Sequence, residues 1–142
     1  MSFESGTVSL RFYHMPRHLP DDAPDLFARH AAPAVETASD APVTGWVTGR
    51  HLLDTHITEE SLQVAGHLRI TLRQAQRKIP TSLLKAECRL EQLAALAAEG
   101  KAFLSAREKS EIRKSVIDRL LPQMPPQLAA IDVVIPGQEK AL

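Results

Sequence analysis

The sequence predicts an α+β fold, with a small antiparallel or mixed sheet, a short N-terminal helix and a long antiparallel helical hairpin. Alternation of apolar and polar residues in several short segments indicates the strands. Two long amphipathic segments in the second half of the chain indicate the hairpin, because a connection of about five residues favours antiparallel neighbours. The 142 residues suffice for one ordinary domain with one core.

Alternating segments predict the strands, which are expected over residues 6–15, 43–48, 67–75 and 131–135. The polar stretch 50–63 is expected to be a loop with one short strand around Leu52. Within 67–75, three apolar residues are expected to face the core. The opposite face of this strand, which carries Arg69 and Arg73, is therefore expected to face solvent.

A short helix is expected over about residues 23–31, inside a stretch that is rich in proline. Asp21 or Asp22 can serve as its N-cap, and Pro24 is tolerated in its first turn. Pro33 is expected to end or kink it, since proline removes a helical hydrogen bond.

The first helix of the hairpin is expected to begin after Thr81 or Ser82 and to end at Gly100, a residue that favours helix C-termini. The second follows a capping box at residues 105–108 and stops before Pro122. The first helix has an apolar stripe with heptad-like spacing, formed by Leu83, Ala86, Leu90, Leu93 and Ala97. The second has a stripe formed by Ile112, Val116, Ile117, Leu120 and Leu121.

The pattern divides the chain into three parts. A strand-rich part with one short helix covers residues 1–79, the hairpin covers 80–122, and residues 123–142 hold a strand and the start of a further unit. We therefore expect one domain or the N-terminal part of a longer protein. Cys88, the single cysteine, lies in a helical pattern and is expected to be a small buried side chain.

Charge is distributed unevenly, although the net charge is zero. Residues 1–65 carry four Lys or Arg and nine Asp or Glu, whereas residues 66–120 carry twelve and six. Residues 121–142 carry one and two. Such a distribution is typical of a protein with one basic region that faces an anion, and equally of helices with solvated charged surfaces.

No pattern of an enzyme or a cofactor site occurs in the sequence. Metal ligands at close spacing, a glycine-rich phosphate loop and a nucleophile elbow are all missing. We therefore expect no catalysis, no cofactor and no metal. We recognise no signal-peptide pattern and no apolar run near the roughly 20 residues that span a membrane, and we therefore expect a cytoplasmic protein.

An ordered set of short motifs between Tyr13 and Pro122 resembles the family of the recombination-associated protein RdgC. The motifs are Gly45-Trp46-Val47, Leu72-Arg73, Arg77, Ile79-Pro80-Thr81-Ser82-Leu83-Leu84-Lys85, Glu108-Lys109, Ile112-Arg113-Lys114 and Leu120-Leu121-Pro122. Two segments depart from the family. Gln123-Met124-Pro125 stands where the family has Arg-Ala-Phe, and Ala130 stands where it has Trp. The family is also about twice as long.

The resemblance implies a non-enzymatic protein, associated with the nucleoid, that binds double-stranded DNA with little sequence preference. It also implies a ring-shaped homodimer that opposes RecA-driven recombination. Binding that ignores sequence requires only cations placed against phosphates. The cations expected to do this are Arg69, Arg73, Arg77, Lys78, Lys85, Lys109, Arg113 and Lys114.

Two alternatives stay open. The later basic cluster, at residues 109–114, fits better an exposed helix face held by the pairs Arg107 with Glu111 and Lys114 with Asp118. The whole chain is also consistent with a protein–protein interaction or dimerisation module, in which the hairpin supplies the contact surface and DNA plays no part.

Overall fold

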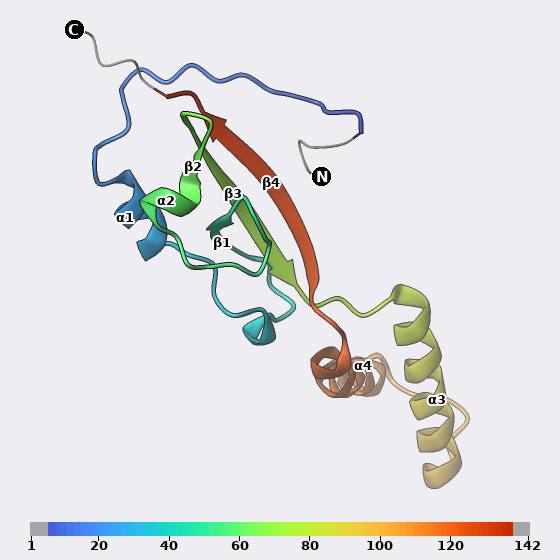
Figure 1. The fold of residues 1–142 in the computed structure, drawn as a ribbon. Helices are drawn as coiled ribbons and strands as arrows, with labels where there is room; N and C mark the ends of the chain where they lie inside the picture. Colours follow the sequence, from blue (N-terminus) through green and yellow to red (C-terminus); the bar gives the residue numbers. More distant parts are fainter. Residues whose placement is uncertain (1–5, 138–142) are drawn as a thin grey trace, which may run out of the picture. The chain divides into compact units, whose positions relative to one another are not determined.

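A computed structural model describes residues 6–137 of the chain (Figure 1). The fold is α+β, as predicted, with a four-stranded sheet, a short N-terminal helix and a helical hairpin. The helices are α1 Ala23–Arg29, α2 Glu59–Leu62, α3 Thr81–Glu99 and α4 Ala106–Leu120, with 3-10 turns η1 Val35–Thr37 and η2 Leu121–Gln123. The strands are β1 Val43–Thr48, β2 Gln63–Val64, β3 His67–Gln76 and β4 Gln127–Ile135.

The chain divides into two compact units. Of the described residues, the sheet unit contains 6–37, 43–75 and 128–137. The hairpin unit contains residues 38–42 and 76–127. The hairpin unit is therefore inserted between β3 and β4 of the sheet unit.

Strand β3 is the centre of the sheet, because it pairs with all three other strands. It runs antiparallel to β1, with Trp46 opposite Leu72, and to β2, with Val64 opposite His67. Figure 1 shows β4 running along β3 in the opposite direction. The turn from β2 to β3 consists of Ala65 and Gly66, which both have positive φ, as a two-residue hairpin requires.

The core of the sheet unit is formed by side chains that pack against β3. Its buried members are Ile57, Leu62 and Ile70. Partly buried apolar residues pack against them, including Phe27, Trp46 and Val133. A Cβ at Gly45 would lie 2.3 Å from the Cα of Ala32, so this position accepts no side chain. The short first helix is confirmed by α1, with Pro24 in its first turn, although Asp22 makes no side-chain capping bond.

Three predictions for this unit are wrong. Residues 6–15 alternate but form no strand, because no described segment pairs with them. Leu52 is not in a strand, and the polar stretch instead contains α2, which Thr58 and Ser61 cap reciprocally. The face of β3 that was expected to meet solvent is covered, since Thr71 and Arg73 are 1% and 2% exposed.

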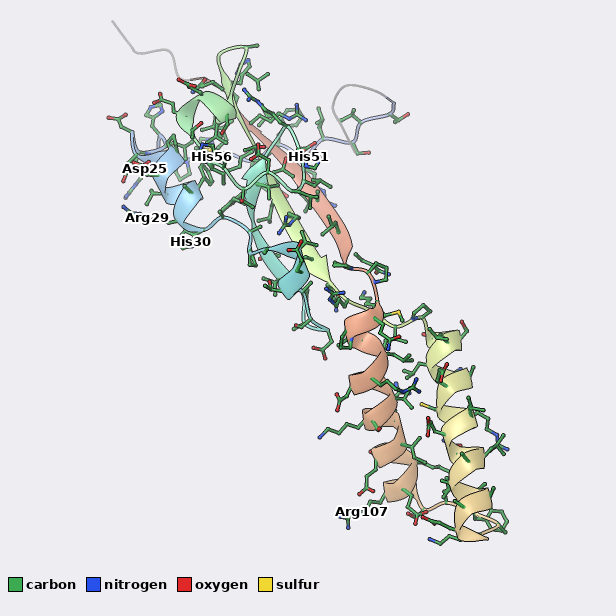
Figure 2. All side chains as sticks on the ribbon, turned by 60° about the horizontal axis from the view of Figure 1, so that its bottom comes forward. Asp25, Arg29, His30, His51, His56 and Arg107 are labelled. Carbon is green, nitrogen blue, oxygen red and sulfur yellow. The ribbon has the colours of Figure 1, made fainter. Side chains whose placement is uncertain are left out.

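The hairpin unit consists of α3 and α4 side by side, as Figure 2 shows. Gly100 ends α3 in the left-handed conformation with φ 63°, and the predicted capping box of Ser105 and Glu108 begins α4. Residue Pro80, not Thr81 or Ser82, occupies the N-cap of α3, and no side chain caps that end. The core of the unit consists of Leu84, Cys88, Val116 and Leu120.

The predicted stripe of α3 meets this core only through Leu83, which packs against it. Its members Leu90 and Leu93 are 62% and 48% exposed, whereas Leu84 and Cys88 are both 8% exposed. The predicted burial of Cys88 is thus confirmed. The stripe of α4 is confirmed, because Ile112, Val116 and Leu120 pack into the core.

Candidate nucleic-acid interface

A basic groove lies between the two helices of the hairpin, with a volume of about 510 Å³. Each helix contributes four of its lining residues, which are Lys85, Cys88, Arg89 and Gln92 on α3 and Ala106, Lys109, Ser110 and Arg113 on α4. Four of these eight side chains are cationic and none is acidic. We call this surface the basic groove.

Helix geometry places the four cations together. Lys85 and Arg89 are four residues apart on α3, as are Lys109 and Arg113 on α4, so each pair shares one helix face. The core residue Cys88 lies at the floor of the groove, and the cations flank the apolar seam. Two antiparallel rows of cations result, one from each helix.

The cations of the basic groove have no partner within the described part of the chain. All four residues are exposed, and none of their side chains makes a hydrogen bond or an ion pair with another of residues 6–137. Unpaired cations that converge on one groove repel one another, and an external anion relieves that repulsion. The groove is therefore suited to a polyanion.

A second groove of the hairpin has the opposite character. It is lined by acidic residues that include Glu91, Glu99, Glu108 and Glu111. Glu91 follows Arg89 by two positions, and Glu111 precedes Arg113 by two, which is a rotation of about 200° around each helix. The two grooves thus lie on different sides of the hairpin.

The acidic groove is neutralised by cations of the chain itself. Lys101 Nζ lies 3.0 Å from carboxylate oxygens of Glu99 and Glu108. Arg107 pairs with Glu111 at 3.2 Å, and Arg119 lies 3.7 Å from Glu91. The ion pair of Arg107 that the sequence suggested is present, but it does not involve the basic groove. The four cations of the basic groove, in contrast, have no such partner among residues 6–137.

The predicted arginines of β3 are placed differently. Arg73 is buried, and its Nη1 and Nη2 donate to the carbonyl oxygens of Leu52 and Pro33, at 2.9 and 2.5 Å. Arg69 is only partly exposed and lies 3.9 Å from the carboxylate of Asp132. Arg73 therefore holds two loops to the sheet and has no surface to offer to a phosphate.

Arg77 and the two remaining lysines lie outside the groove. Arg77 donates from Nε to the carbonyl of Ala38 at 2.8 Å and from Nη1 to the carbonyl of Met124, which ties together segments of the hairpin unit. Lys78 and Lys114 are exposed and do not line the groove. Of the eight predicted residues, the structure brings together Lys85, Lys109 and Arg113.

Arg89 belongs to the groove but was not among the predicted residues. Its spacing from Lys85 repeats the spacing of Arg113 from Lys109, and this repeat could have identified it. The order along the sequence obscured it, because Glu87 and Glu91 flank Arg89 and make that stretch look balanced in charge.

Two further features of the described residues bear on function. Within residues 6–137, no three His, Cys, Asp or Glu side chains are grouped so that they could hold a metal ion. No helix in the same range is long and apolar enough to cross a membrane.

The fold and the groove define an α+β protein with an inserted helical hairpin that presents unpaired cations. The model of one family, described as "Putative exonuclease, RdgC", matches residues 9–142. The chain therefore belongs to the RdgC family, as its motifs suggested, and this membership supports a recombination-associated function. No curated protein matches the chain.

Proposed function

We propose that the chain binds double-stranded DNA through its phosphate backbone, without sequence preference, and that the basic groove is the binding site. The observation that carries this proposal is the set of four cations on one groove without internal partners. Phosphate contacts position a protein on a duplex but carry no base information, so such a set gives affinity without specificity.

The salt dependence of binding tests the site. Four phosphate contacts give a slope of log K against log salt of about −3.5. We would measure the anisotropy of a labelled duplex of about 30 base pairs at several salt concentrations. Changing Lys85, Arg89, Lys109 and Arg113 to Gln is expected to remove most of the slope. An unchanged slope in this variant would place the DNA contacts elsewhere.

A matched control keeps the same helices and changes charge outside the groove. Arg107 and Lys114 lie on α4 but do not line it, and Figure 2 shows Arg107 in the first turn of α4. Changing both to Gln is expected to leave the slope nearly unchanged. A loss as large as that of the groove variant would point to net charge rather than to the groove. The same comparison tests Lys114, and a separate Lys78→Gln variant tests Lys78.

Cys88 offers a local readout that does not depend on charge. It is the only cysteine of the chain and lines the floor of the groove. Saturating duplex is expected to slow the reaction of Cys88 with a thiol reagent, because DNA covers the groove. Full reactivity in the presence of bound duplex would contradict this position of the DNA.

The family description names an exonuclease, so the same duplex must also be followed for degradation. We infer binding without cleavage, and incubation with Mg²⁺ is expected to leave the labelled strand at full length. Shortened products that depend on the protein would assign a nuclease activity instead. Opposition to RecA is a finer proposal, and reduced strand exchange by RecA on DNA coated with this chain is its test.

A second candidate function is a protein–protein interaction or homodimerisation module. The stripe of α3 supports it, because Leu90 and Leu93 are largely exposed with Ala86 and Ala97 beside them. Heptad spacing of apolar residues suits contact with another helix. Sedimentation is expected to show self-association that Leu90→Glu weakens, because this change places a charge on the stripe. A monomer at every concentration would remove the self-associating form of this candidate.

A further inference from the structure

The sheet has an open edge along β4. This strand of nine residues pairs with β3, and no other described segment pairs along its outer edge. Its single charged side chain is Asp132. The carboxylate of Asp132 accepts a hydrogen bond from Thr71 on the neighbouring strand β3, at 2.5 Å, and so does not block pairing at the outer edge. Ile131 and Val134 are 66% and 46% exposed. Natural edges are usually blocked by charge, proline or a bulge, and a long apolar edge without these pairs readily with another strand.

A segment with the matching pattern lies elsewhere in the chain. Residues 7–13, TVSLRFY, alternate as a strand does, yet they make no hydrogen bond with any other of residues 6–137. The apolar members of the alternation are Val8, Leu10 and Phe12, which are 42%, 59% and 90% exposed. Extended, these seven residues span about 23 Å and fit within the roughly 30 Å of β4. Residues 7–13 therefore have the pattern of a strand but no pairing partner, and the outer edge of β4 has no strand paired with it.

The path of the chain disfavours pairing of this segment with its own β4. Tyr13 and residues 15–18 line a small pocket together with Ile135 and Pro136, so the segment leaves the C-terminal end of β4. If residues 7–13 turned back along that edge, they would run parallel to β4, in a sheet that is otherwise antiparallel. Parallel pairs are somewhat less stable per residue. A segment from a second molecule has no such constraint.

We propose that residues 7–13 of one copy add antiparallel to the open edge of β4 in a second copy. Because each copy has both donor and acceptor, the exchange is reciprocal and closes as a two-fold dimer. Backbone hydrogen bonds supply the affinity, and burial of Val8, Leu10 and Phe12 adds to it. The surface is distinct from the stripe of α3 and from the basic groove, so this inference stands without the proposed function.

Disulfide trapping between two different variants tests the exchange. One variant carries Leu10→Cys and the other Ile131→Cys, both with Cys88→Ala. A mixed disulfide between them can form only between molecules. Mild oxidation of the mixture is expected to give this mixed dimer in high yield. Absence of the mixed dimer, also with the donor cysteine at Val8 or Phe12, would overturn the proposal.

Two controls separate pairing from random collision. Leu53 is 54% exposed in a loop, and an acceptor with Leu53→Cys in place of Ile131→Cys is expected to give little mixed dimer. Leu10→Pro with the donor cysteine at Val8 is expected to remove the product, because proline lacks the amide that a strand donates. Equal yields in any of these pairs would contradict a specific strand contact.

Pairing within one molecule is distinguished by a single chain that carries both Leu10→Cys and Ile131→Cys. The exchange predicts disulfide-linked dimers and sedimentation as a dimer. A disulfide that forms inside the monomer at every concentration would show that the segment closes on its own sheet and would overturn the exchange. Far-UV circular dichroism of each variant verifies that it is folded before the comparison.

Discussion

Arg73 shows how a cation in a promising sequence position can serve the fold instead. On the alternation of β3 it faces away from Ile70, which suggested solvent, but the structure covers this face. The guanidinium binds the carbonyls of Pro33 and Leu52, far from it in sequence. Alternation shows that a strand has two faces, but only the fold decides that both are covered.

Removal of Arg73 is therefore expected to cost stability rather than DNA affinity. Arg73→Ala loses two charge-assisted hydrogen bonds and leaves a cavity, a loss of about 3 kcal/mol in the free energy of unfolding. Urea denaturation measures it. Gln74→Ala, at the next and exposed position of the same strand, is expected to change the free energy by less than about 0.5 kcal/mol. A small loss of unfolding free energy for Arg73→Ala, together with a reduced slope of log K against log salt, would show instead that Arg73 contacts DNA.

Asp54 fixes the loop that follows β1. Its carboxylate accepts from the backbone amide of His56 at 3.0 Å and from the Thr48 hydroxyl at 2.9 Å. These two hydrogen bonds hold the pKa of Asp54 below its ordinary value, and the bond from the His56 amide contributes more than the bond from the Thr48 hydroxyl. A lowered folded-state pKa stabilises the fold above the unfolded-state pKa, and this stabilisation is lost as the pH falls through the folded-state pKa.

The pH dependence of stability tests the role of Asp54. Asp54→Asn is expected to lower the free energy of unfolding by about 1 kcal/mol at pH 7, a value reduced by solvent screening. The difference from the parent protein is expected to shrink as the pH falls below about 4. Urea titrations at both pH values measure it. A difference that is the same at pH 7 and pH 3 would show that the charge of Asp54 does not contribute.

At the scale of elements, the sequence predicts the existence and type of the long ones well. Both helices of the hairpin, β1, β3 and the capping box at Ser105 agree with the structure, because local propensity, caps and periodicity all favour them. The failures are elements that depend on a distant partner. Residues 6–15 have the pattern of a strand but find no neighbour, and β2 exists only through the turn that pairs it with β3.

The face of α3 is the most instructive of these failures. Heptad spacing selected Leu90 and Leu93, yet the side facing α4 holds Leu84 and Cys88. Helix α3 has apolar residues on two sides, and periodicity alone cannot decide which side meets the partner helix. For the same reason, the sequence predicted only some of the cations of the basic groove. Which cations of α3 line the groove depends on which face of α3 packs on α4.

Paired truncations on α3 test this assignment. Leu84→Ala is expected to cost about 3 kcal/mol, because the side chain is buried in the hairpin core. Leu93→Ala removes the same atoms from a side chain that is 48% exposed and is expected to cost less than about 1 kcal/mol. Thermal or urea unfolding of both variants gives the comparison. A larger loss for Leu93 than for Leu84 would reverse the assignment of the two faces.

At the scale of the molecule, the two units have separate cores, and the reporters of their folding are separate too. Trp46, the only tryptophan, lies in the sheet unit with its ring centroid 5.0 Å from that of Phe27. Helices α3 and α4 contain 19 and 15 residues, against 7 and 4 in α1 and α2, so helical circular dichroism reports mainly on the hairpin unit. Two probes can therefore follow the two units in one sample.

Because each core is formed within its own unit, a core truncation is expected to affect one probe more than the other. Val116→Ala, in the hairpin core, removes about 2 kcal/mol and should move the urea midpoint of circular dichroism while the fluorescence midpoint of Trp46 stays in place. Ile70→Val, in the sheet core, costs about 1 kcal/mol and should do the reverse. If both probes move together in both variants, the chain unfolds as one cooperative unit. In that case the hairpin cannot open while the sheet stays folded, and release of DNA from the basic groove cannot involve separate unfolding of the hairpin.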